Sequence, residues 1–259
     1  MNRIENGFHN KPIFMPYFPL GYPDLETSID VIEALAKNGA DLIEVGLSFS
    51  DPLADGPVIQ KATQVALEQG ITVRRSLEAL RELRRRGVDI PLVLMGYYNP
   101  MLAYGLEQFI CDAVEAGADG FIIPDLPVEE SEEFAEATRA APWQPPLIQM
   151  LAPTTPDERM EGIARNAKGF IYLVSVTGVT GERKSISEGL AALINRVRAH
   201  TTVPVCVGFG IGTPEQAREV SKMADGVIVG TACVRTIGES AHPVETAGQF
   251  AAEFHRALR

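Results

Sequence analysis

The sequence is poor in several residue types, and each shortage excludes a class of protein. It has three cysteines, Cys111, Cys206 and Cys233, and no CxxC pair, so neither a disulfide framework nor a zinc site is expected. Basic residues number 23 against 34 acidic ones, and the net charge of −11 argues against nucleic acid as a partner. No apolar run approaches the roughly 20 residues that span a bilayer, and the first ten residues contain no apolar signal segment. We therefore expect a cytoplasmic protein without membrane contact.

The rest of the chain alternates between short apolar runs and amphipathic segments. Eight runs rich in Val, Ile and Leu predict strands that are buried on both faces of a parallel sheet. These strands are expected at residues 13–18, 41–47, 91–97, 119–124, 147–151, 169–175, 203–207 and 225–229. Helices are expected at residues 24–38, 72–86, 106–116, 128–140, 156–167, 186–199, 214–222 and 246–258.

Eight β/α units in a chain of about 250 residues favour a (β/α)8 TIM barrel within the α/β class. The alternative is a doubly wound open sheet, but no G-x-G-x-x-G motif follows the first strand. Three helix-to-strand junctions, at residues 38–41, 116–119 and 222–225, each end in Ala-Asp, which indicates a repeated unit. No linker or low-complexity segment is evident. We therefore predict a single barrel domain that covers residues 1–259.

Histidine and lysine are scarce where a barrel would place its chemistry, at the carboxyl ends of the strands. All four histidines lie away from those ends: His9, His200, His242 and His255. No lysine lies on a predicted strand. A histidine base, a histidine-bound metal, a Ser-His-Asp triad and a Schiff-base lysine therefore have no obvious members. Carboxylates and tyrosines remain as the acid/base groups.

Three acidic residues belong to the second predicted strand and its loop. Glu44 lies inside an apolar run, Asp51 and Asp55 follow, and no Lys, Arg or His lies between residues 44 and 57. An isolated buried carboxylate is costly and favours its neutral form, which suits proton transfer near neutral pH. Glu44 paired with a distant arginine, and Asp51 before Pro52 as a simple turn, are structural alternatives. A divalent metal held by all three acids is another, although the spacing matches no metal loop known to us.

Glycine-rich turns follow the sixth, seventh and eighth predicted strands, at residues 178–181, 208–212 and 230–231. The loops after strands 7 and 8 of this barrel commonly bind phosphate through backbone N–H groups. Glycine allows the backbone to approach such a ligand closely. Tight turns without a ligand are the alternative. Because no basic pocket is obvious in this acidic chain, we expect the backbone to hold any phosphate.

The segment from Glu44 to Pro57, EVGLSFSDPLADGP, resembles the signature of the tryptophan synthase alpha subunit family. Further motifs resemble that family in the same order, at residues 15–24, 97–100, 124–130, 152–155, 175–181 and 208–211. The resemblance implies a lyase of tryptophan biosynthesis that cleaves indole-3-glycerol phosphate to indole and glyceraldehyde 3-phosphate. It implies no cofactor and no metal on this chain. It also implies a beta subunit with pyridoxal phosphate that receives indole through a tunnel, in an alpha2beta2 heterotetramer.

The same resemblance implies a role for each matching residue. The catalytic positions are Glu44 as general acid/base, Asp55 as stabiliser of the indole nitrogen, and Tyr172 as the active-site tyrosine. The substrate-binding positions are Tyr17, Tyr97, Thr180, Gly181, Gly210, Gly230 and Thr231. The positions that face the partner are Asp51 and Pro52. Three places depart from the family pattern. Ser48 replaces the usual proline, Thr231 replaces the usual serine, and Pro19-Leu20 replaces a threonine-containing stretch after the first strand.

The retro-aldol reaction fits these residue types. It needs one carboxyl group that cycles its proton and one that stays ionised, without a metal or a Schiff base. Three functions remain open on the sequence: the lyase within a two-subunit complex, a stand-alone lyase that releases free indole, and a barrel that mainly activates its beta partner. An isomerase or a class I aldolase is disfavoured, because its histidine base or strand lysine is missing.

Overall fold

Eight parallel strands form one sheet in a computed structural model that describes residues 3–10, 12–174, 183–208 and 210–259, with backbone alone for 183–188. The strand order is β4-β3-β2-β1-β8-β7-β6-β5. All eight predicted strands are present, with ends displaced by at most two residues. Their bounds are β1 Ile13–Pro19, β2 Ile43–Gly46, β3 Leu92–Met95, β4 Gly120–Ile122, β5 Gln149–Leu151, β6 Ile171–Val174, β7 Val205–Gly208 and β8 Gly226–Val229.

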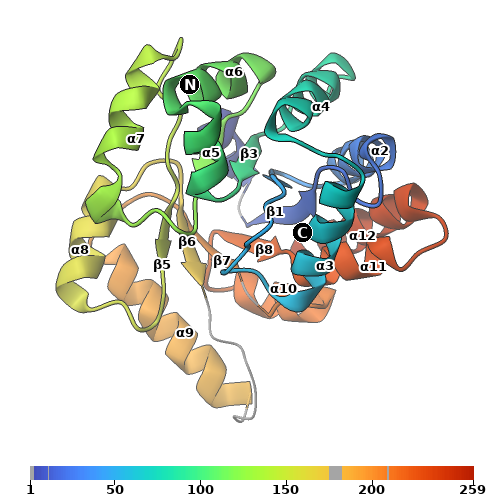
Figure 1. Ribbon diagram of the computed structural model, residues 1–259. Helices are drawn as coiled ribbons and strands as arrows, with labels where there is room; N and C mark the ends of the chain where they lie inside the picture. The colour runs from blue at the N-terminus through green and yellow to red at the C-terminus, as the bar shows by residue number, and fades with distance from the viewer. Residues whose placement is uncertain (1–2, 11, 175–182, 209) are drawn as a thin grey trace.

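The two ends of this strand order meet and close the sheet into a barrel. Phe121 of β4 forms an isolated parallel bridge with Leu147, just before β5. The Ile148 N–H donates to the Phe121 carbonyl at 2.8 Å, and the Phe121 N–H donates to the Pro146 carbonyl at 2.9 Å. The (β/α)8 barrel is therefore confirmed over the doubly wound open sheet, and helices surround the strands in Figure 1.

Seven of the helices predicted from amphipathic segments are present on the outside of the barrel. They are α2 Leu25–Lys37, α4 Val73–Arg85, α6 Leu106–Ala116, α8 Asp157–Asn166, α9 Arg183–Arg198, α10 Pro214–Ser221 and α12 Pro243–Leu258. The predicted helix at 128–140 is wrong as a single element. It divides into η2 Val128–Glu130, α7 Glu132–Ala137 and η3 Thr138–Ala140, and Ser131 at the first break donates its hydroxyl to the Val128 carbonyl at 2.8 Å.

Five helices were not predicted among the described residues. They are α1 Arg3–Gly7, η1 Phe8–Asn10, α3 Pro57–Glu68, α5 Tyr98–Tyr104 and α11 Thr231–Gly238. Helix α3 begins with proline at its first position and Gly56 at its N-cap, a start that resembles a turn when it is read from sequence alone. Helices α5 and α11 begin within three residues of a strand end, and α3 ends the long loop after β2, so all three shape the loops of the candidate site.

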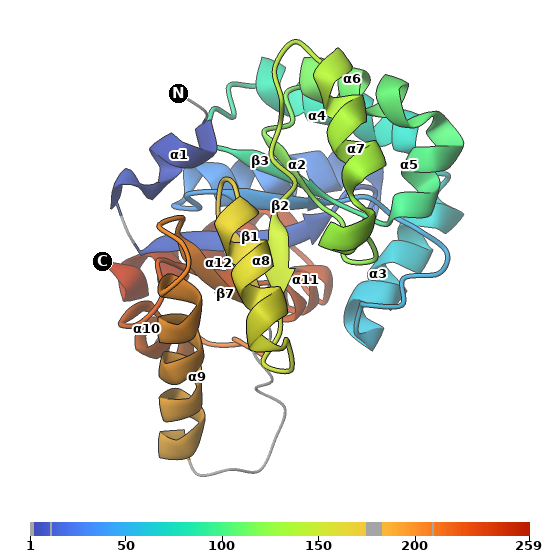
Figure 2. The same cartoon turned by 90° about the vertical axis from the view of Figure 1, so that its left-hand side faces the viewer.

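The barrel interior is a packed core that is closed at its amino-terminal end. Ile13 and Met15 of β1 belong to a buried cluster with residues that lie in, or directly before, each of the seven other strands, among them Tyr172 and Cys206. Ile4 and Phe8, from α1 and η1, complete this cluster. Figure 2 shows α1 and both chain ends on one side of the molecule and α3 on the other. The opposite, carboxyl-terminal end is left for the site.

The three Ala-Asp junctions predicted as repeats make the same contact. Each aspartate accepts a hydrogen bond from a backbone N–H at the start of the neighbouring strand. Asp41, Asp119 and Asp225 accept from Phe14, Leu92 and Val205, at 2.8, 2.9 and 2.9 Å. These contacts join adjacent strands at the amino-terminal end of the barrel.

Each of these aspartates also pairs with an arginine. Arg259, Arg84 and Arg198 pair with Asp41, Asp119 and Asp225 at 2.7, 2.5 and 3.0 Å. A charge-assisted pair satisfies a carboxylate that would otherwise be costly to bury.

Among the helices in the described ranges, none is long and apolar enough to cross a bilayer.

Candidate active site

Glu44 lies in the middle of β2, in register with Tyr17 of β1 and Val93 of β3. Alternation along the strand directs it to the same side as Leu42, which belongs to the interior cluster. Its side chain is 1% exposed, and Oε1 has no hydrogen-bond partner among the described residues. Burial, and then the nearby charge of Asp55, raise the pKa of Glu44 to about 8. The carboxyl group is therefore mainly protonated at neutral pH and can exchange that proton there.

Asp55 lies in the loop between β2 and α3 and is partly buried. The Tyr97 hydroxyl donates to Asp55 Oδ2 at 3.1 Å and accepts from the Ala54 N–H at 2.9 Å. Burial raises the pKa of Asp55, and the hydrogen bond from Tyr97 opposes that rise. Within the described part of the chain, no lysine or arginine forms an ion pair with Asp55 or Glu44.

Two tyrosines approach these acids from different strands. Tyr17 of β1 and Tyr172 of β6 are 6% and 7% exposed. A side-chain carbon on Gly46 or Gly208 would overlap the hydroxyl of Tyr17 or Tyr172, so each hydroxyl lies over a glycine of the next strand. Burial and the charges of the two acids raise the pKa of both tyrosines well above the usual range. Both therefore stay neutral hydrogen-bonding groups beside the carboxylates.

Asp51 and Pro52 lie apart from this cluster, on the exposed part of the loop after β2. Asp51 is exposed, and its carboxylate accepts the Ser50 hydroxyl at 2.5 Å. Leu53 follows with 92% of its side chain exposed. No group of three or more possible metal ligands occurs among the described residues, so the three acids do not form the metal site considered from sequence.

Ser48, the residue that replaces the family's proline, contacts the residue that follows β1. Its hydroxyl donates to the Leu20 carbonyl at 3.5 Å, and the Leu20 N–H donates to the Gly46 carbonyl at 3.0 Å. The side-chain contact is long, so it restrains the loop weakly. The ring of Phe49 packs on Tyr97 with ring centroids 5.5 Å apart and gives a second point of attachment.

Of the residues predicted to bind phosphate, some lie within the described part of the chain and some do not. Thr180 and Gly181 lie outside the described residues. Gly210 has a φ of 79°, in the region that favours glycine, and is exposed. Gly230 is the N-cap of α11 and Thr231 is its first, exposed residue. A side-chain carbon on Gly230 would lie 3.7 Å from the Tyr17 Cβ, so α11 begins beside the acid and tyrosine cluster.

Helices α10 and α11 differ in how their first turns are capped. In α10, Gln216 Oε1 accepts the N–H groups of Gly212 and Thr213 at 2.7 and 3.2 Å, and the Thr213 hydroxyl accepts the Gln216 N–H at 3.3 Å. This capping box satisfies the amides that would otherwise face an anion. Helix α11 has glycine as its N-cap and therefore no side-chain cap. The first-turn N–H groups of α11 therefore have no side-chain cap, unlike those of α10.

Sequence reasoning missed three parts of this site. The first is the pair Gly46 and Gly208, which give room for the hydroxyls of Tyr17 and Tyr172. Gly46 lies two residues after Glu44 on the same face of the strand, and this spacing could have indicated an open space beside Glu44. The second is the contact of Tyr97 with the loop after β2. The contact of Tyr97 with Ala54 and Asp55 had no local signal. The third is Asp125, which accepts the Tyr98 N–H at 3.0 Å and so caps the start of α5.

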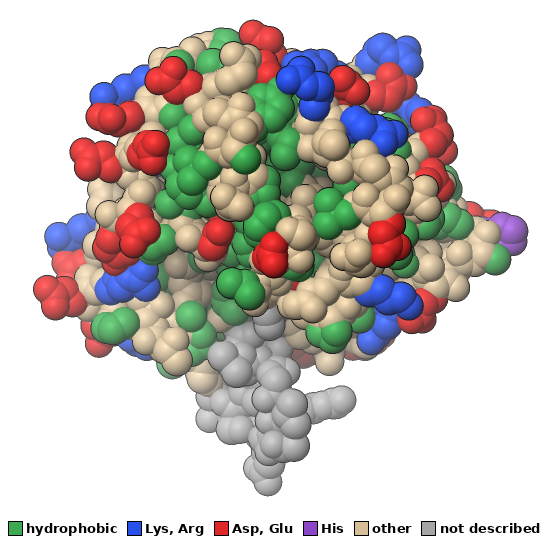
Figure 3. Space-filling view, viewed as in Figure 1, with side chains coloured by type: hydrophobic (Ala, Val, Ile, Leu, Met, Phe, Trp, Pro, Cys, Tyr) green, Lys and Arg blue, Asp and Glu red, His purple; other side chains and the backbone are tan. Residues whose placement is uncertain are grey.

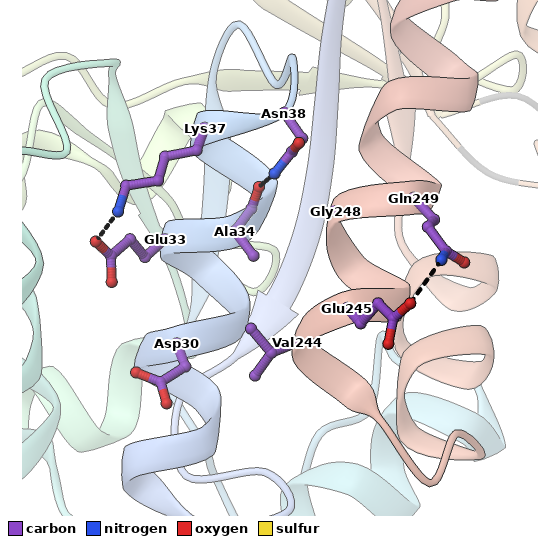
Figure 4. A pocket seen from close by; sticks show the side chains of 9 residues that line it. All are labelled: Asp30, Glu33, Ala34, Lys37, Asn38, Val244, Glu245, Gly248 and Gln249. Atoms are coloured by element: carbon purple, nitrogen blue, oxygen red, sulfur yellow. Dashed lines mark hydrogen bonds and ion pairs between the residues drawn. The ribbon is translucent and has the colours of Figure 1, made fainter.

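The surface around the site is partly apolar. Figure 3, in the view of Figure 1, shows hydrophobic side chains across the middle of the face that carries α3 and α5, with a few acidic side chains among them and most charged side chains toward its edges. A different groove of about 470 Å³ lies outside the barrel, between α2 and α12. Figure 4 shows that its polar side chains pair locally, as in Glu33 with Lys37 and Gln249 with Glu245. No chemistry is indicated for that groove.

Comparisons with known proteins agree with this geometry. The family model described as "Tryptophan synthase alpha chain" matches residues 5–258. The tryptophan synthase alpha chain of Roseiflexus castenholzii is 48% identical over 264 residues and covers 100% of both chains. That of Petrotoga mobilis is 44% identical over 240 residues, which cover 93% of this chain and 92% of the relative.

Solved structures give the same result. The crystal structure of the tryptophan synthase alpha subunit from Legionella pneumophila has a TM-score of 0.90 and 36% identity, and the match covers 100% of this chain and 98% of the other. A chain of tryptophan synthase from M. tuberculosis has a TM-score of 0.88 and 32% identity, with 100% of both chains covered. This chain therefore belongs to the tryptophan synthase alpha chain family.

Proposed function

We propose that this chain cleaves indole-3-glycerol phosphate to indole and glyceraldehyde 3-phosphate as a single (β/α)8 domain. One observation carries the proposal: the carboxyl group of Glu44 is buried beside a second acid, Asp55, its Oε1 has no partner among the described residues, and no described cation pairs with either acid. A fixed cation beside Glu44 would favour its ionised form and remove the proton that the reaction needs.

The two acids divide the chemistry between them. Glu44 donates its proton to C3 of the indole ring, and Asp55 accepts the N1–H, where positive charge develops. Ionised Glu44 then removes the proton of the hydroxyl on the side-chain carbon that is bonded to C3. The carbon–carbon bond breaks, its electrons return to the ring, and the hydroxyl carbon becomes the aldehyde. Glu44 ends protonated, so the step balances and follows general acid/base catalysis.

The neighbouring tyrosines and the start of α11 complete the proposed site. We assign Tyr172 to a hydrogen bond with the reacting hydroxyl, because its neutral phenol lies within electrostatic reach of both acids. Tyr17 and Tyr97 would line the indole pocket. The phosphate would lie at the uncapped start of α11, against Gly230 and Thr231.

The remaining phosphate positions follow from the family motif. Gly210 belongs to the loop after β7, and Thr180 and Gly181 belong to the loop after β6. We keep all three as predicted phosphate contacts. The glycine backbone at Gly210 is free of a side chain that would block the approach of a ligand.

We further propose that indole passes to a beta subunit, in an alpha2beta2 complex in the cytoplasm. Asp51, Pro52 and the exposed Leu53 form a protruding loop suited to such a contact. On this proposal the alpha chain needs no cofactor or metal, and pyridoxal phosphate belongs to the partner. A stand-alone lyase would use the same active site without this contact.

An assay of indole release tests the proposal. Purified chain is given indole-3-glycerol phosphate, and a tryptophan synthase beta subunit is titrated in. Turnover that rises with the beta subunit supports the complex, whereas full turnover without it supports the stand-alone lyase. The absence of indole and glyceraldehyde 3-phosphate under both conditions would contradict the proposed reaction.

A further inference from the structure

Tyr97 stands between β3 and α5, where it serves as the N-cap residue of that helix. Its side chain is 5% exposed, and its ring packs on Phe49 from the loop after β2, with the ring planes inclined by 36°. The tyrosine is therefore held by its own strand end and by the loop that carries the second acid. A ring fixed in this way can place its hydroxyl accurately.

The Tyr97 hydroxyl contacts two consecutive residues of that loop in different ways. Its oxygen accepts the Ala54 N–H at 2.9 Å, so that contact uses a lone pair. Its single proton is then available for Asp55 Oδ2, at 3.1 Å. Among the described residues, nothing donates a hydrogen bond to Asp55 Oδ1. The contact therefore occupies one oxygen of the carboxylate and leaves the other for a ligand.

The hydrogen bond from Tyr97 to Asp55 matters because none of the other described titratable groups that face Asp55 favours its ionised form. The groups that face Asp55 are Glu44 from β2, Tyr17 from β1, Tyr172 from β6 and Tyr97 itself. Burial raises the pKa of Asp55, and the hydrogen bond from Tyr97 lowers it. In the described part of the chain, Tyr97 is thus the neighbour that favours the ionised form of Asp55.

We propose that Tyr97 is a positioning residue, whose hydroxyl fixes the loop at Ala54 and holds Asp55 by Oδ2 so that Oδ1 accepts the N–H of the substrate. The proposal rests on the proposed function, because it assigns a substrate N–H to Asp55. It differs from a simple lining role for Tyr97, since the effect passes through another residue.

The substitution Tyr97→Phe keeps the ring and removes the hydroxyl. Tyr98→Phe is the matched control, because the Tyr98 hydroxyl donates to Glu133 at 3.3 Å, on α7 and away from Asp55. Indole release is measured across pH for both variants. We expect kcat of Tyr97→Phe to fall about tenfold to a hundredfold, as a hydrogen bond to a charged group is lost. The acidic limb of its pH profile should move to higher pH, because Asp55 becomes harder to ionise.

A profile of Tyr97→Phe that matches wild type in both kcat and acidic limb would overturn the proposal. A second measurement does not depend on turnover. The Asp55 carboxyl carbon is titrated by 13C NMR in substrate-free wild type, Tyr97→Phe and Tyr98→Phe. The proposal expects a higher pKa of Asp55 in Tyr97→Phe alone. An unchanged value there rejects Tyr97 even if the lyase activity is confirmed, and a wild type without lyase activity rejects the function while the titration still reports on Tyr97.

Discussion

The buried acids at the two ends of the barrel differ in whether an arginine pairs with them. At the amino-terminal end, Asp119 is paired with Arg84 at 2.5 Å and with Arg3 at 3.0 Å, and it also accepts a backbone N–H. At the carboxyl-terminal end, Glu44 forms no ion pair with any described residue, and its Oε1 has no hydrogen-bond partner among them. Both side chains are almost fully buried, at 1% exposure each.

This difference separates stability from chemistry within one barrel. An arginine-paired acid fixes a junction between strands, and its charge is satisfied in the folded state. An unpaired buried acid costs free energy, but its proton is free to move near neutral pH. The amino-terminal end of such barrels serves stability and the carboxyl-terminal end serves catalysis. For these two buried acids, the presence of an arginine partner for Asp119 and its absence among the described residues for Glu44 match the two tasks.

The largest expected effect comes from Glu44→Gln. The amide keeps the size of the side chain but cannot donate and recover a proton, so kcat should fall about a hundredfold to ten-thousandfold. Binding of indole-3-glycerol phosphate, measured by calorimetry, should persist. Substantial turnover in this variant would break the comparison, because the unpaired acid would then have no chemical role.

The same variant should differ from wild type in how its stability depends on pH. Glu44 has a folded-state pKa of about 8, against a usual value of 4.5. Between these values the unfolded chain releases a proton that the folded chain keeps, so wild type loses stability as pH rises through this window. Below pH 4.5, Glu44 is protonated in both the folded and the unfolded chain, so it no longer lowers the free energy of unfolding.

Glu44→Gln should therefore gain stability relative to wild type from pH 4.5 to pH 9, by a difference on the order of 4 kcal/mol. Chemical denaturation at a series of pH values measures the difference between the two proteins. A constant difference across that range would mean that Glu44 titrates alike in the folded and unfolded chains.

Arg84→Met tests the amino-terminal end. The Arg84 side chain is 14% exposed, and its loss leaves the buried Asp119 with a weaker set of partners. We expect unfolding to become easier by about 3 kcal/mol, with kcat of the folded enzyme within twofold of wild type. Thermal denaturation and the indole assay measure the two quantities. A large fall in kcat without a loss of stability would show that the two ends are not independent.

Arg198→Met should have the smallest effect. Arg198 pairs with Asp225 at 3.0 Å, but its side chain is 41% exposed and solvent screens the pair. The expected loss of stability is below about 1 kcal/mol. A loss as large as that of Arg84→Met would mean that burial does not set the strength of these junctions.

Much of the fold could be predicted because continuous apolar runs mark strands buried on both faces. The helices α3, α5 and α11 could not, since Gly56-Pro57, Asn99-Pro100 and Gly230-Thr231 read equally well as turns and as helix starts. Tertiary contacts at the ends of the strands decide between these readings. Sequence alone also did not show that the predicted helix at 128–140 is divided into three short elements.

The candidate site was predictable where one residue conflicts with its local sequence. Glu44 is visible as a charge inside an apolar run, and the glycine turns are visible as clusters. The contact between Tyr97 and Asp55 spans 42 residues and depends on how a loop returns to the barrel, so no local pattern reports it. The arginine pairs at the other end of the barrel likewise join residues that are far apart in the chain.

The central claim is that Glu44 holds a mobile proton because it is buried without a cation. Titration of the Glu44 carboxyl carbon by 13C NMR tests it directly, with Glu44→Gln to assign the signal. The account predicts a midpoint at about pH 8 in the substrate-free protein. A midpoint at or below the usual 4.5 would contradict it, because Glu44 would then be ionised at neutral pH and would have no proton to donate.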